Sequence, residues 1–280
     1  MNTNVDKPKL KSFIRCPGNK SRHIKKISPY LPNPGNYDRY IEPFLGSGAM
    51  FLALQPKKFI INDINKDCIN CWKSIRDEPN YIIKEFKAFG KKFKPLSKED
   101  KIEWCREITA EIEEQPYDIN RAIDFMLMNH CVYMGRLIRN KNMKFYGLCN
   151  KIDKFHFLQD KYFDNINNIT KILGNKTIHN KDYKKILHKT KEGDFVFLDP
   201  PYIQENYQFK YNKNEELDNT FLNDLVKELR KLDKKRVLWL MTQADTKSIK
   251  KKLNKYNIFK FPVYRNHKQS YENELIITNY

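Results

Sequence analysis

The sequence predicts an α/β fold with a mostly parallel sheet, an inserted helical subdomain and a closing antiparallel hairpin. Short apolar, β-prone segments alternate with helical patterns, as expected of a parallel sheet. These segments are residues 38–42, 58–62, 176–179, 194–198 and 237–241. The stretch between the second and third segments is too long for a crossover connection. We therefore expect one domain from residues 1–67 and 175–280, with residues 68–174 as a helical insertion.

The composition indicates a polyanionic partner. The chain has 280 residues, with 53 Lys or Arg against 34 Asp or Glu, which gives a net charge of +19. Such an excess favours nucleic acid. No apolar run approaches the roughly 20 residues that span a bilayer, and the polar first residues lack the apolar segment of a secretory signal. We expect a cytoplasmic protein without a membrane partner.

The cysteines do not predict a metal site. All six are scattered along the chain, which favours reduced thiols. Cys68 and Cys71 form a C-x-x-C pair. A four-ligand zinc site needs a second pair at a similar spacing, and the sequence has none.

The first candidate loop leads from an apolar segment into a turn. Residues 13–20 end in Cys16-Pro17-Gly18-Asn19-Lys20, and we expect a helix over residues 21–28. The backbone amides of a glycine loop, together with a lysine, can hold a carboxylate or a phosphate. Taken alone, such a stretch is more often an ordinary turn.

A strand, a glycine turn and a helix come next. Residues 38–42 lead into Gly46 and Gly48, and the helix covers residues 49–54. This βα unit is typical of nucleotide binding, because the glycines let the backbone approach a ligand closely. The following strand delivers Asp63, 15 residues after Gly48, where a carboxylate can accept from both hydroxyls of a ribose. A third glycine is missing, which favours an adenosyl ligand without phosphates over a dinucleotide.

The insertion combines helices with a basic and aromatic stretch. Helical periodicity appears at residues 81–89, 98–114 and 119–134. Residues 136–161 then contain seven Lys or Arg against two acids, interleaved with aromatic residues. This mixture suits phosphate contact and base reading. The alternative is a helical cap with a solvated face.

Two further strands bring acids to the same edge of the sheet. Residues 176–179 lead to Asp182 and Tyr183, where the Asp182 side chain or the neighbouring backbone is expected to meet the adenine ring of a cofactor. Residues 194–198 lead to Asp199-Pro200-Pro201-Tyr202. Ligands of open α/β sheets bind at the carboxyl ends of the strands. The two prolines stiffen the turn and leave carbonyls as acceptors. A carboxylate, a carbonyl and a ring together suit a planar group with an amino donor, such as a nucleobase.

The remaining segments complete the sheet. A tyrosine-rich loop at residues 203–216 is a candidate lid, and apolar spacing predicts a helix over residues 219–232. Residues 245–246 begin a lysine-rich helix, and residues 258–263 and 275–278 are expected to pair as the hairpin. Residues 227–268 carry 14 Lys or Arg against 3 acids, a balance of +11. This face is either solvated or runs along a phosphate backbone.

The motifs occur in a familiar order. Residues 13–20 and 41–48, Asn62-Asp63-Ile64-Asn65 and Asp199-Pro200-Pro201-Tyr202 together resemble the adenine-specific DNA methyltransferases of the DNA adenine methyltransferase type. The resemblance extends to the spacing of Tyr211 and Phe221 and to Asn273-Glu274-Leu275. It implies a Rossmann-like methyltransferase sheet with a target-recognition insertion. It also implies methyl transfer from S-adenosylmethionine to the N6 amino group of an adenine flipped out of DNA.

The resemblance assigns roles to matching residues. Asp199 and Pro200 would accept the amino hydrogens of the target adenine, within a turn that Pro201 stiffens, and Tyr202 would stack on its ring. The cofactor would be held by Cys16, Gly18, Lys20, Glu42, Phe44, Gly46, Gly48, Asp63, Asp182, Tyr183 and Asp199. Contacts to double-stranded DNA are expected from Tyr133, Arg136, Arg139, Lys141, Lys144, Arg265 and Lys268.

Several alternatives stay open at this point. Cys16 stands where the family usually has an aromatic residue, and Asn19 replaces a glycine. An RNA adenine methyltransferase and a catalytically silent DNA-binding relative are both compatible with the pattern. We expect a bacterial or viral enzyme that is a monomer or weak dimer, with a cognate restriction nuclease as a potential partner.

Overall fold

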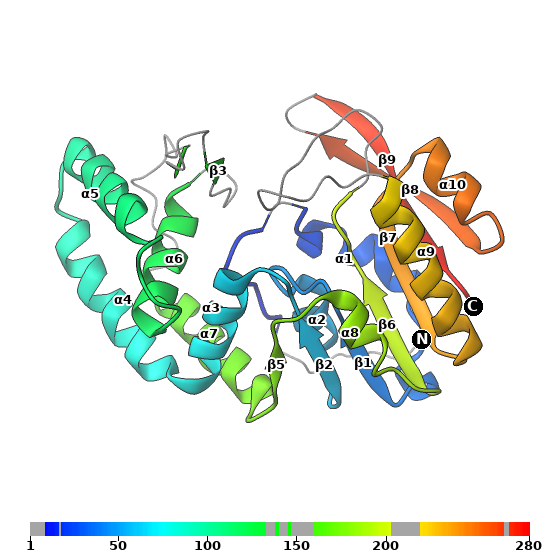
Figure 1. Cartoon of the computed structure of the whole chain (residues 1–280). Helices are drawn as coiled ribbons and strands as arrows, with labels where there is room; N and C mark the ends of the chain where they lie inside the picture. The colour runs from blue at the N-terminus through cyan, green and yellow to red at the C-terminus, as the bar shows by residue number, and fades with distance from the viewer. Residues whose placement is uncertain are drawn as a thin grey trace. The chain divides into compact units, whose positions relative to one another are not determined.

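The fold is taken from a computed structural model that describes residues 9–16, 18–132, 159–202, 219–265 and 269–280, and the backbone of 138–139 and 145–146. Seven strands of this described part form one sheet in the order β5-β2-β1-β6-β7-β9-β8 (Figure 1). They are β1 (Arg39–Glu42), β2 (Phe59–Asn62), β5 (Ile178–His179), β6 (Asp194–Leu198), β7 (Leu238–Ala244), β8 (Asn257–Arg265) and β9 (Ser270–Thr278).

The pairing of the strands confirms the predicted fold class. β1 pairs in parallel with β2 and β6, and β6 pairs in parallel with β7. β9 runs antiparallel to both β7 and β8, as the predicted hairpin requires. β7 and the hairpin strands are longer than the apolar pattern predicted, because polar residues continue each strand beyond its apolar run.

The described residues fall into two compact units. The helical unit contains the described parts of Met1–Arg22, Gly46–Gln55 and Asn65–Asn180, and the sheet unit contains those of His23–Leu45, Pro56–Ile64 and Lys181–Tyr280. The division expected from the sequence, into residues 1–67 with 175–280 and residues 68–174, stays a prediction.

The helical unit is built mainly from α-helices, and three of them begin at a side-chain cap. The helices are α2 (Ala49–Leu54), α3 (Lys66–Asp77), α4 (Pro79–Phe93), α5 (Lys98–Glu111), α6 (Ile119–Cys131) and α7 (Asp160–Leu173), with the 3-10 turn η1 (Lys20–Arg22) and the strand pair β3 (Ile138–Arg139) and β4 (Phe145–Tyr146). Side chains of Asn65, Ser97 and Asp118 accept from backbone amides at the starts of α3, α5 and α6. Such caps satisfy the first free N–H groups of a helix.

A buried arginine joins α3 and α6. Arg121 is 3% exposed, and its guanidinium donates to Asp67 at 2.7 Å and to the carbonyl of Gln115 at 2.9 Å. Because a buried charge is tolerated only when it is paired and hydrogen-bonded, this residue fixes how the two helices pack.

The sheet unit carries its own helices. They are α1 (Ile24–Ile27), α8 (Tyr183–Leu187), α9 (Asn219–Lys234) and α10 (Lys247–Lys252), with 3-10 turns η2 (Ser28–Tyr30) and η3 (Pro34–Asn36). The helix expected over residues 21–28 is instead divided into η1, α1 and η2. Pro29 lies at the start of η2 and has no N–H to continue α1.

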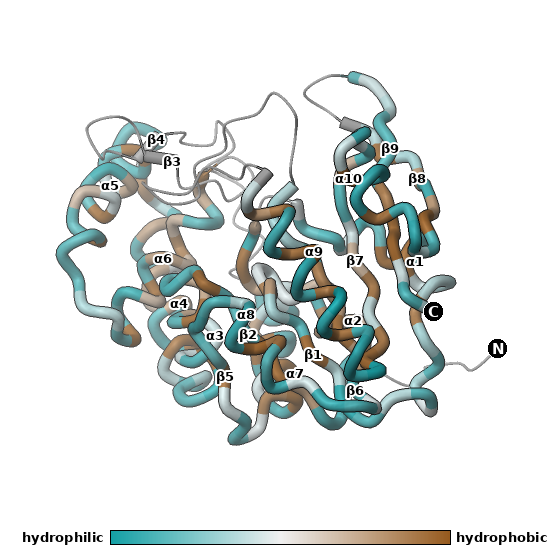
Figure 2. The backbone as a smooth tube through the Cα atoms, turned by 45° about the vertical axis from the view of Figure 1, so that its right-hand side comes forward, coloured by the Kyte–Doolittle hydropathy of each residue, from teal (hydrophilic) through white to brown (hydrophobic). Residues whose placement is uncertain are grey.

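The core of the sheet unit lies between α9 and the strands. All five residues of β6 are buried, and Leu225 and Leu229 of α9 are fully buried. Hydrophobic and hydrophilic residues alternate along α9 in Figure 2, as expected of an amphipathic helix. In the described part of the chain, none of the helices has the length and apolarity that crossing a membrane demands.

Candidate active site

The turn at residues 199–202 leaves the carboxyl end of β6. The last residue of β6, Leu198, is aligned with Met241 of β7, so Asp199 follows alongside Thr242. The hydroxyl of Thr242 donates to Oδ1 of Asp199 at 2.6 Å. Thr242 is fully buried and Asp199 is half-buried. This bond fixes the orientation of the Asp199 carboxylate.

Two more side chains hold the rest of the turn. The hydroxyl of Tyr202 donates to Oε2 of Glu274 at 2.6 Å, and Glu274 is 2% exposed. The amide of Gln243 reaches the carbonyl of Pro201 at 3.4 Å. Pro200 is buried, while Pro201 and Tyr202 are half-buried. The turn is therefore anchored to β7 and β9 by side chains. The sequence analysis named only Glu274 among them, within Asn273-Glu274-Leu275, and gave it no role.

The end of β1 contains a second tyrosine-carboxylate pair. The hydroxyl of Tyr40 donates to Oε2 of Glu42 at 2.6 Å, and both residues are buried. Burial, followed by the charge of Glu42, raises the pKa of Tyr40. Two residues further on, the ring of Phe44 lies 5.1 Å from the ring of Tyr183. These contacts place predicted cofactor residues Glu42, Phe44 and Tyr183 within the sheet unit.

Asn62, at the end of β2, connects three chain segments. It is fully buried, and its side-chain NH₂ donates to the carbonyls of Pro43 and Lys181, both at 2.9 Å. Its Oδ1 accepts from the amide of Lys181 at 2.9 Å. Asp63, the predicted ribose ligand, follows directly and is half-buried. Asn62 thus fixes the backbone on which Asp63 and Asp182 are carried.

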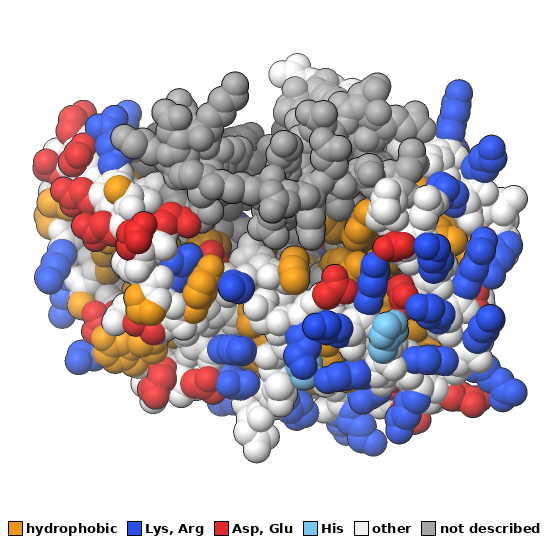
Figure 3. All heavy atoms as spheres, viewed as in Figure 1, with side chains coloured by type: hydrophobic (Ala, Val, Ile, Leu, Met, Phe, Trp, Pro, Cys, Tyr) orange, Lys and Arg blue, Asp and Glu red, His pale blue; other side chains and the backbone are white. Residues whose placement is uncertain are grey.

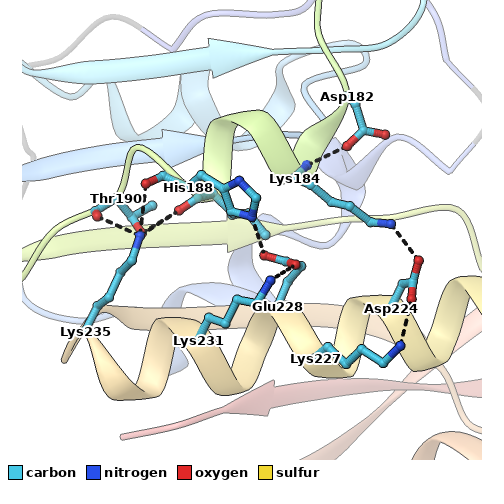
Figure 4. Close-up of polar contacts among 10 residues, drawn as sticks. Asp182, Lys184, His188, Thr190, Asp224, Lys227, Glu228, Lys231 and Lys235 are labelled. Carbon is cyan, nitrogen blue, oxygen red and sulfur yellow. Dashed lines mark hydrogen bonds and ion pairs between the residues drawn. The ribbon is translucent and has the colours of Figure 1, made fainter.

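Asp182 begins α8. Its carboxylate accepts from the amide of Lys184 at 2.8 Å (Figure 4), which is the geometry of a helix N-cap. Tyr183 is 7% exposed, and its hydroxyl is buried without a hydrogen-bond partner among the described residues. Burial raises the pKa of Tyr183. Asp182 therefore positions the first turn of α8 and with it the ring of Tyr183.

The glycine turn belongs to the helical unit. Gly46 and Gly48 have φ values of +48° and +66°, which favour glycine. The carbonyl of Gly46 accepts from Nε1 of Trp72 at 3.1 Å and from Sγ of Cys68 at 3.0 Å. A Cβ at Gly46 would lie 3.8 Å from that of Cys16. The predicted cofactor residues Cys16 and Gly46 are thus in close contact, and Cys68 supports the turn.

The segment before the lysine loop is held by amide side chains. Oδ1 of Asn129 accepts from the amide of Arg15 at 2.6 Å, while its Nδ2 donates to the Arg15 carbonyl at 2.8 Å. Asn165 makes the same pair of bonds to Lys11 at 2.9 and 2.7 Å. At the end of this loop, Lys20 is 3% exposed and donates to the carbonyl of Gly18 at 3.0 Å.

His130 contributes to the same support. Its Nε2 lies 3.0 Å from the carbonyl of Phe13, which also accepts from the hydroxyl of Tyr162 at 2.9 Å. Burial, followed by the charge of Arg15, lowers the pKa of His130 to about 3. The sequence analysis had no signal for this role, because Phe13 and Arg15 lie more than a hundred residues away in the chain.

Most predicted DNA contacts lie outside the described residues. This applies to Tyr133, Arg136, Lys141, Lys144 and Lys268. Arg139 lies in β3 and Arg265 is the last residue of β8, and only the backbone of these two residues is described. Within the sheet unit, Lys and Arg side chains gather over α8 and α9 (Figure 3). Several of them pair with acids, including Lys184 with Asp224 and Lys231 with Glu228.

Comparison with known proteins gives consistent results. A family model described as D12 class N6 adenine-specific DNA methyltransferase matches residues 17–266. Type II methyltransferase M.MjaIII of Methanocaldococcus jannaschii is 29% identical over 251 residues, which cover 84% of this chain and 84% of the relative. Type II methyltransferase M1.LlaDCHI of Lactococcus lactis subsp. cremoris is 27% identical over 293 residues, with 98% and 97% covered. DNA adenine methylase of Haemophilus influenzae is 26% identical over 250 residues, with 86% and 82% covered.

Proposed function

We propose, from the premise that this chain belongs to the D12 class N6 adenine-specific DNA methyltransferase family, that residues 199–202 hold the adenine that is methylated. The enzyme methylates the N6 amino group of adenine in DNA and uses S-adenosylmethionine as methyl donor. The observation that carries the proposal is the pair of 2.6 Å hydrogen bonds that fix Asp199 and Tyr202. A turn held this firmly presents a carboxylate, a carbonyl and a ring in a defined arrangement.

The proposed role of Asp199 and Pro200 follows from the chemistry of an aromatic amine. The lone pair of N6 is delocalised into the adenine ring, so the amine is a weak nucleophile. The Asp199 carboxylate and the Pro200 carbonyl accept the two N–H groups and favour a pyramidal nitrogen. As N6 bonds to the methyl carbon, the electrons of the carbon–sulfur bond stay on sulfur, and N6 loses one proton towards Asp199. The negative charge of Asp199 stabilises the positive charge that develops on N6.

Tyr202 is proposed to receive the adenine outside the helix. N6 is not accessible to attack while the base is stacked in a duplex, so the nucleotide must turn out. Turning it out costs a few kcal/mol, which stacking on an aromatic ring partly returns. Tyr202 is half-buried and tethered at its hydroxyl, which leaves the ring as a defined stacking surface.

Residues of the sheet unit fit the adenosyl part of the cofactor. The ring pair of Phe44 and Tyr183 offers an aromatic surface for an adenine, and the buried Tyr183 hydroxyl offers a polar group that has no hydrogen-bond partner among the described residues. Asp63 is proposed to accept from the ribose hydroxyls, with Asp182 placing Tyr183. Glu42 and Asp199 complete the proposed set in this unit. When bound, S-adenosylmethionine supplies a methyl group on a cationic sulfur.

Residues of the helical unit fit the methionine end. Gly18 and Lys20 combine a positive φ of +77° with a buried ammonium group, which suits a carboxylate. Gly46 and Gly48 have no side chain and take positive φ values, so the backbone at these residues can approach a ligand closely. Cys16 is proposed to line the same loop, since its side chain lies against Gly46.

The proposed substrate form is double-stranded DNA. The net charge of +19 supports a polyanion. We assign phosphate and base contacts to Tyr133, Arg136, Arg139, Lys141, Lys144, Arg265 and Lys268. The names of two relatives contain the words Type II methyltransferase, which supports a restriction-modification setting with a cognate nuclease. A monomer or weak dimer is the proposed state.

The test is transfer of labelled methyl groups from S-adenosylmethionine to adenine-containing duplexes. We expect the wild-type chain to label DNA, and Asp199→Ala to lose labelling while it keeps its fold. Glu192→Ala is a matched control, because Glu192 is an exposed carboxylate that pairs with Arg236. Full labelling by Asp199→Ala would contradict the assigned role. No labelling of any adenine-containing duplex by the wild type would contradict the function itself.

A further inference from the structure

A buried carboxylate lies at the hydroxyl end of the proposed stacking ring. Glu274 belongs to β9, where it is aligned with Ala244 of β7 and Phe261 of β8. It is 2% exposed, and its Oε2 accepts from the hydroxyl of Tyr202 at 2.6 Å. A carboxylate at such a position is costly unless it is hydrogen-bonded. If this position served only to pack the β8–β9 hairpin, an apolar side chain would serve at least as well.

The bond between these two residues is short. A separation of 2.6 Å lies in the range of hydrogen bonds from a hydroxyl to an ionised carboxylate, about 2.5–2.7 Å. Such a bond restricts rotation of the phenol about its own axis and about the side-chain bonds. It also draws the proton away from the phenol oxygen and makes the ring richer in electrons.

Both consequences bear on the transfer step. An adenine that stacks on Tyr202 gains positive charge at N6 while its new bond to carbon forms. An aromatic face attracts a cation, and the attraction grows when the site excludes water. A ring that is fixed in place and electron-rich therefore stabilises the transition state more than it stabilises the bound adenine. Interactions of this kind raise kcat rather than lower KM.

We infer that Glu274 is a positioning residue for methyl transfer, acting through the hydroxyl of Tyr202. The inference rests on the proposed role of the turn and adds a residue 72 positions away in the chain. It assigns to the C-terminal hairpin a share in catalysis, in addition to completing the sheet.

The experiment is a double-mutant cycle. Tyr202→Phe keeps the ring and removes the donor, while Glu274→Gln keeps the size of the side chain and removes the charge. We expect each single variant to lower kcat by roughly tenfold, with KM for DNA and for S-adenosylmethionine within about twofold. Because both act through one bond, the double variant should be no slower than the slower single variant.

A matched control separates this role from a structural one. The hydroxyl of Tyr256 donates to Oδ2 of Asp233 at 2.6 Å, which is the same kind of bond away from the turn. Tyr256→Phe should lower thermal stability as Tyr202→Phe does, with kcat unchanged. Since Tyr202→Phe deletes a single oxygen, it gives a result even if Glu274→Gln does not fold.

Two results would overturn the inference. One is an unchanged kcat in Tyr202→Phe, and the other is full additivity of the two single effects in the double variant. Either result leaves the proposed function standing as long as the wild type labels DNA and Asp199→Ala does not. Failure of the proposed function would give a different result, namely a wild-type chain that transfers no methyl group.

Discussion

The turn at residues 199–202 and the segment at residues 11–16 are held in different ways. In the turn, Thr242 and Glu274 bind the functional groups themselves, the carboxylate of Asp199 and the hydroxyl of Tyr202. In the N-terminal segment, Asn129 and Asn165 bind the backbone of Arg15 and Lys11. Each asparagine presents an acceptor and a donor, as a neighbouring strand would.

The difference predicts different consequences of mutation. A contact to a functional group sets the orientation of that group, so its loss should lower the rate of the chemical step. A contact to the backbone sets where a loop lies, so its loss should weaken ligand binding or stability. The following variants test this contrast, beginning with the largest expected effect.

Thr242→Val is expected to have the largest effect on the rate. Valine replaces the hydroxyl with a methyl group of similar size, so packing in β7 is kept while Asp199 loses a donor at 2.6 Å. Loss of a hydrogen bond to a charged group costs about 1.5–3 kcal/mol. We expect kcat to fall by roughly 10- to 100-fold, measured as single-turnover methyl transfer at saturating S-adenosylmethionine.

Thr190→Val is the control for Thr242→Val. Thr190 is 5% exposed, and its hydroxyl donates to the backbone carbonyl of Leu187 at 2.7 Å. The contrast predicts that Thr190→Val lowers stability and leaves kcat unchanged. Equal losses of kcat in both variants would show that a buried hydroxyl matters for the fold and not for Asp199 in particular.

The sequence identified the groups in the turn but not the contacts that hold them, since Glu274 was named only within Asn273-Glu274-Leu275 and without a role. An acid, two prolines and an aromatic residue after an apolar run form a local pattern, so residues 199–202 were found. Thr242 and Gln243 lie just beyond the apolar run at residues 237–241, and Glu274 lies just before the run at residues 275–278. Apolar patterning ends the strands at these residues, whereas the sheet continues through them.

The partners of these residues depend on strand register. Thr242 meets Asp199 because Leu198 is aligned with Met241, and no local pattern specifies that alignment. Asn129 illustrates the same limit in the helical unit, since its partner Arg15 is 114 residues away. The predicted fold class needed only the order and character of the segments, which explains why it is confirmed by the observed sheet.

Asn129→Leu should act on cofactor binding. The variant leaves the amide and the carbonyl of Arg15 without their side-chain partner, next to Cys16 and the lysine loop. These bonds are part-buried, and Asn129 is 2% exposed, so leaving the two backbone groups unsatisfied costs at most about 1–3 kcal/mol. We expect KM for S-adenosylmethionine to rise roughly tenfold, for a loss near 1.4 kcal/mol, with kcat at saturation nearly unchanged.

Asn165→Leu provides the comparison for Asn129→Leu. Asn165 makes the same two bonds, but to Lys11 and at an exposed position. Its loss should raise KM for S-adenosylmethionine by less than twofold, because water can replace the side chain. A fall in kcat as large as that of Thr242→Val in either asparagine variant would break the contrast between the two regions.

Because His130 helps to hold residues 11–16, the stability of the folded chain should depend on pH. Its pKa is lowered from 6.5 to about 3, first by burial and then by the charge of Arg15. Between these values the unfolded chain binds a proton that the folded chain does not. The free energy of unfolding should therefore decrease as pH falls below 6.5, by at most about 1.4 kcal/mol per pH unit. Urea unfolding from pH 7 to pH 5 measures this slope.

The variant His130→Gln should flatten the slope over that range. His188→Asn is the control, because the imidazole of His188 is 58% exposed and lies outside this segment. An unchanged slope in His130→Gln would assign the pH dependence to other groups.

Asp182→Ala is expected to have a small effect, and it tests the contrast inside the sheet unit. Asp182 is a proposed cofactor residue, yet its carboxylate accepts from the backbone amide of Lys184 at 2.8 Å. A contact to the backbone should affect stability and binding rather than kcat, and loss of an N-cap costs about 1 kcal/mol. Asp182→Asn keeps an acceptor for the cap and removes the charge. If Asp182 acts by placing Tyr183, Asp182→Asn restores the affinity for S-adenosylmethionine that Asp182→Ala loses, as measured by calorimetry. If its charge contacts the cofactor directly, both variants bind equally weakly.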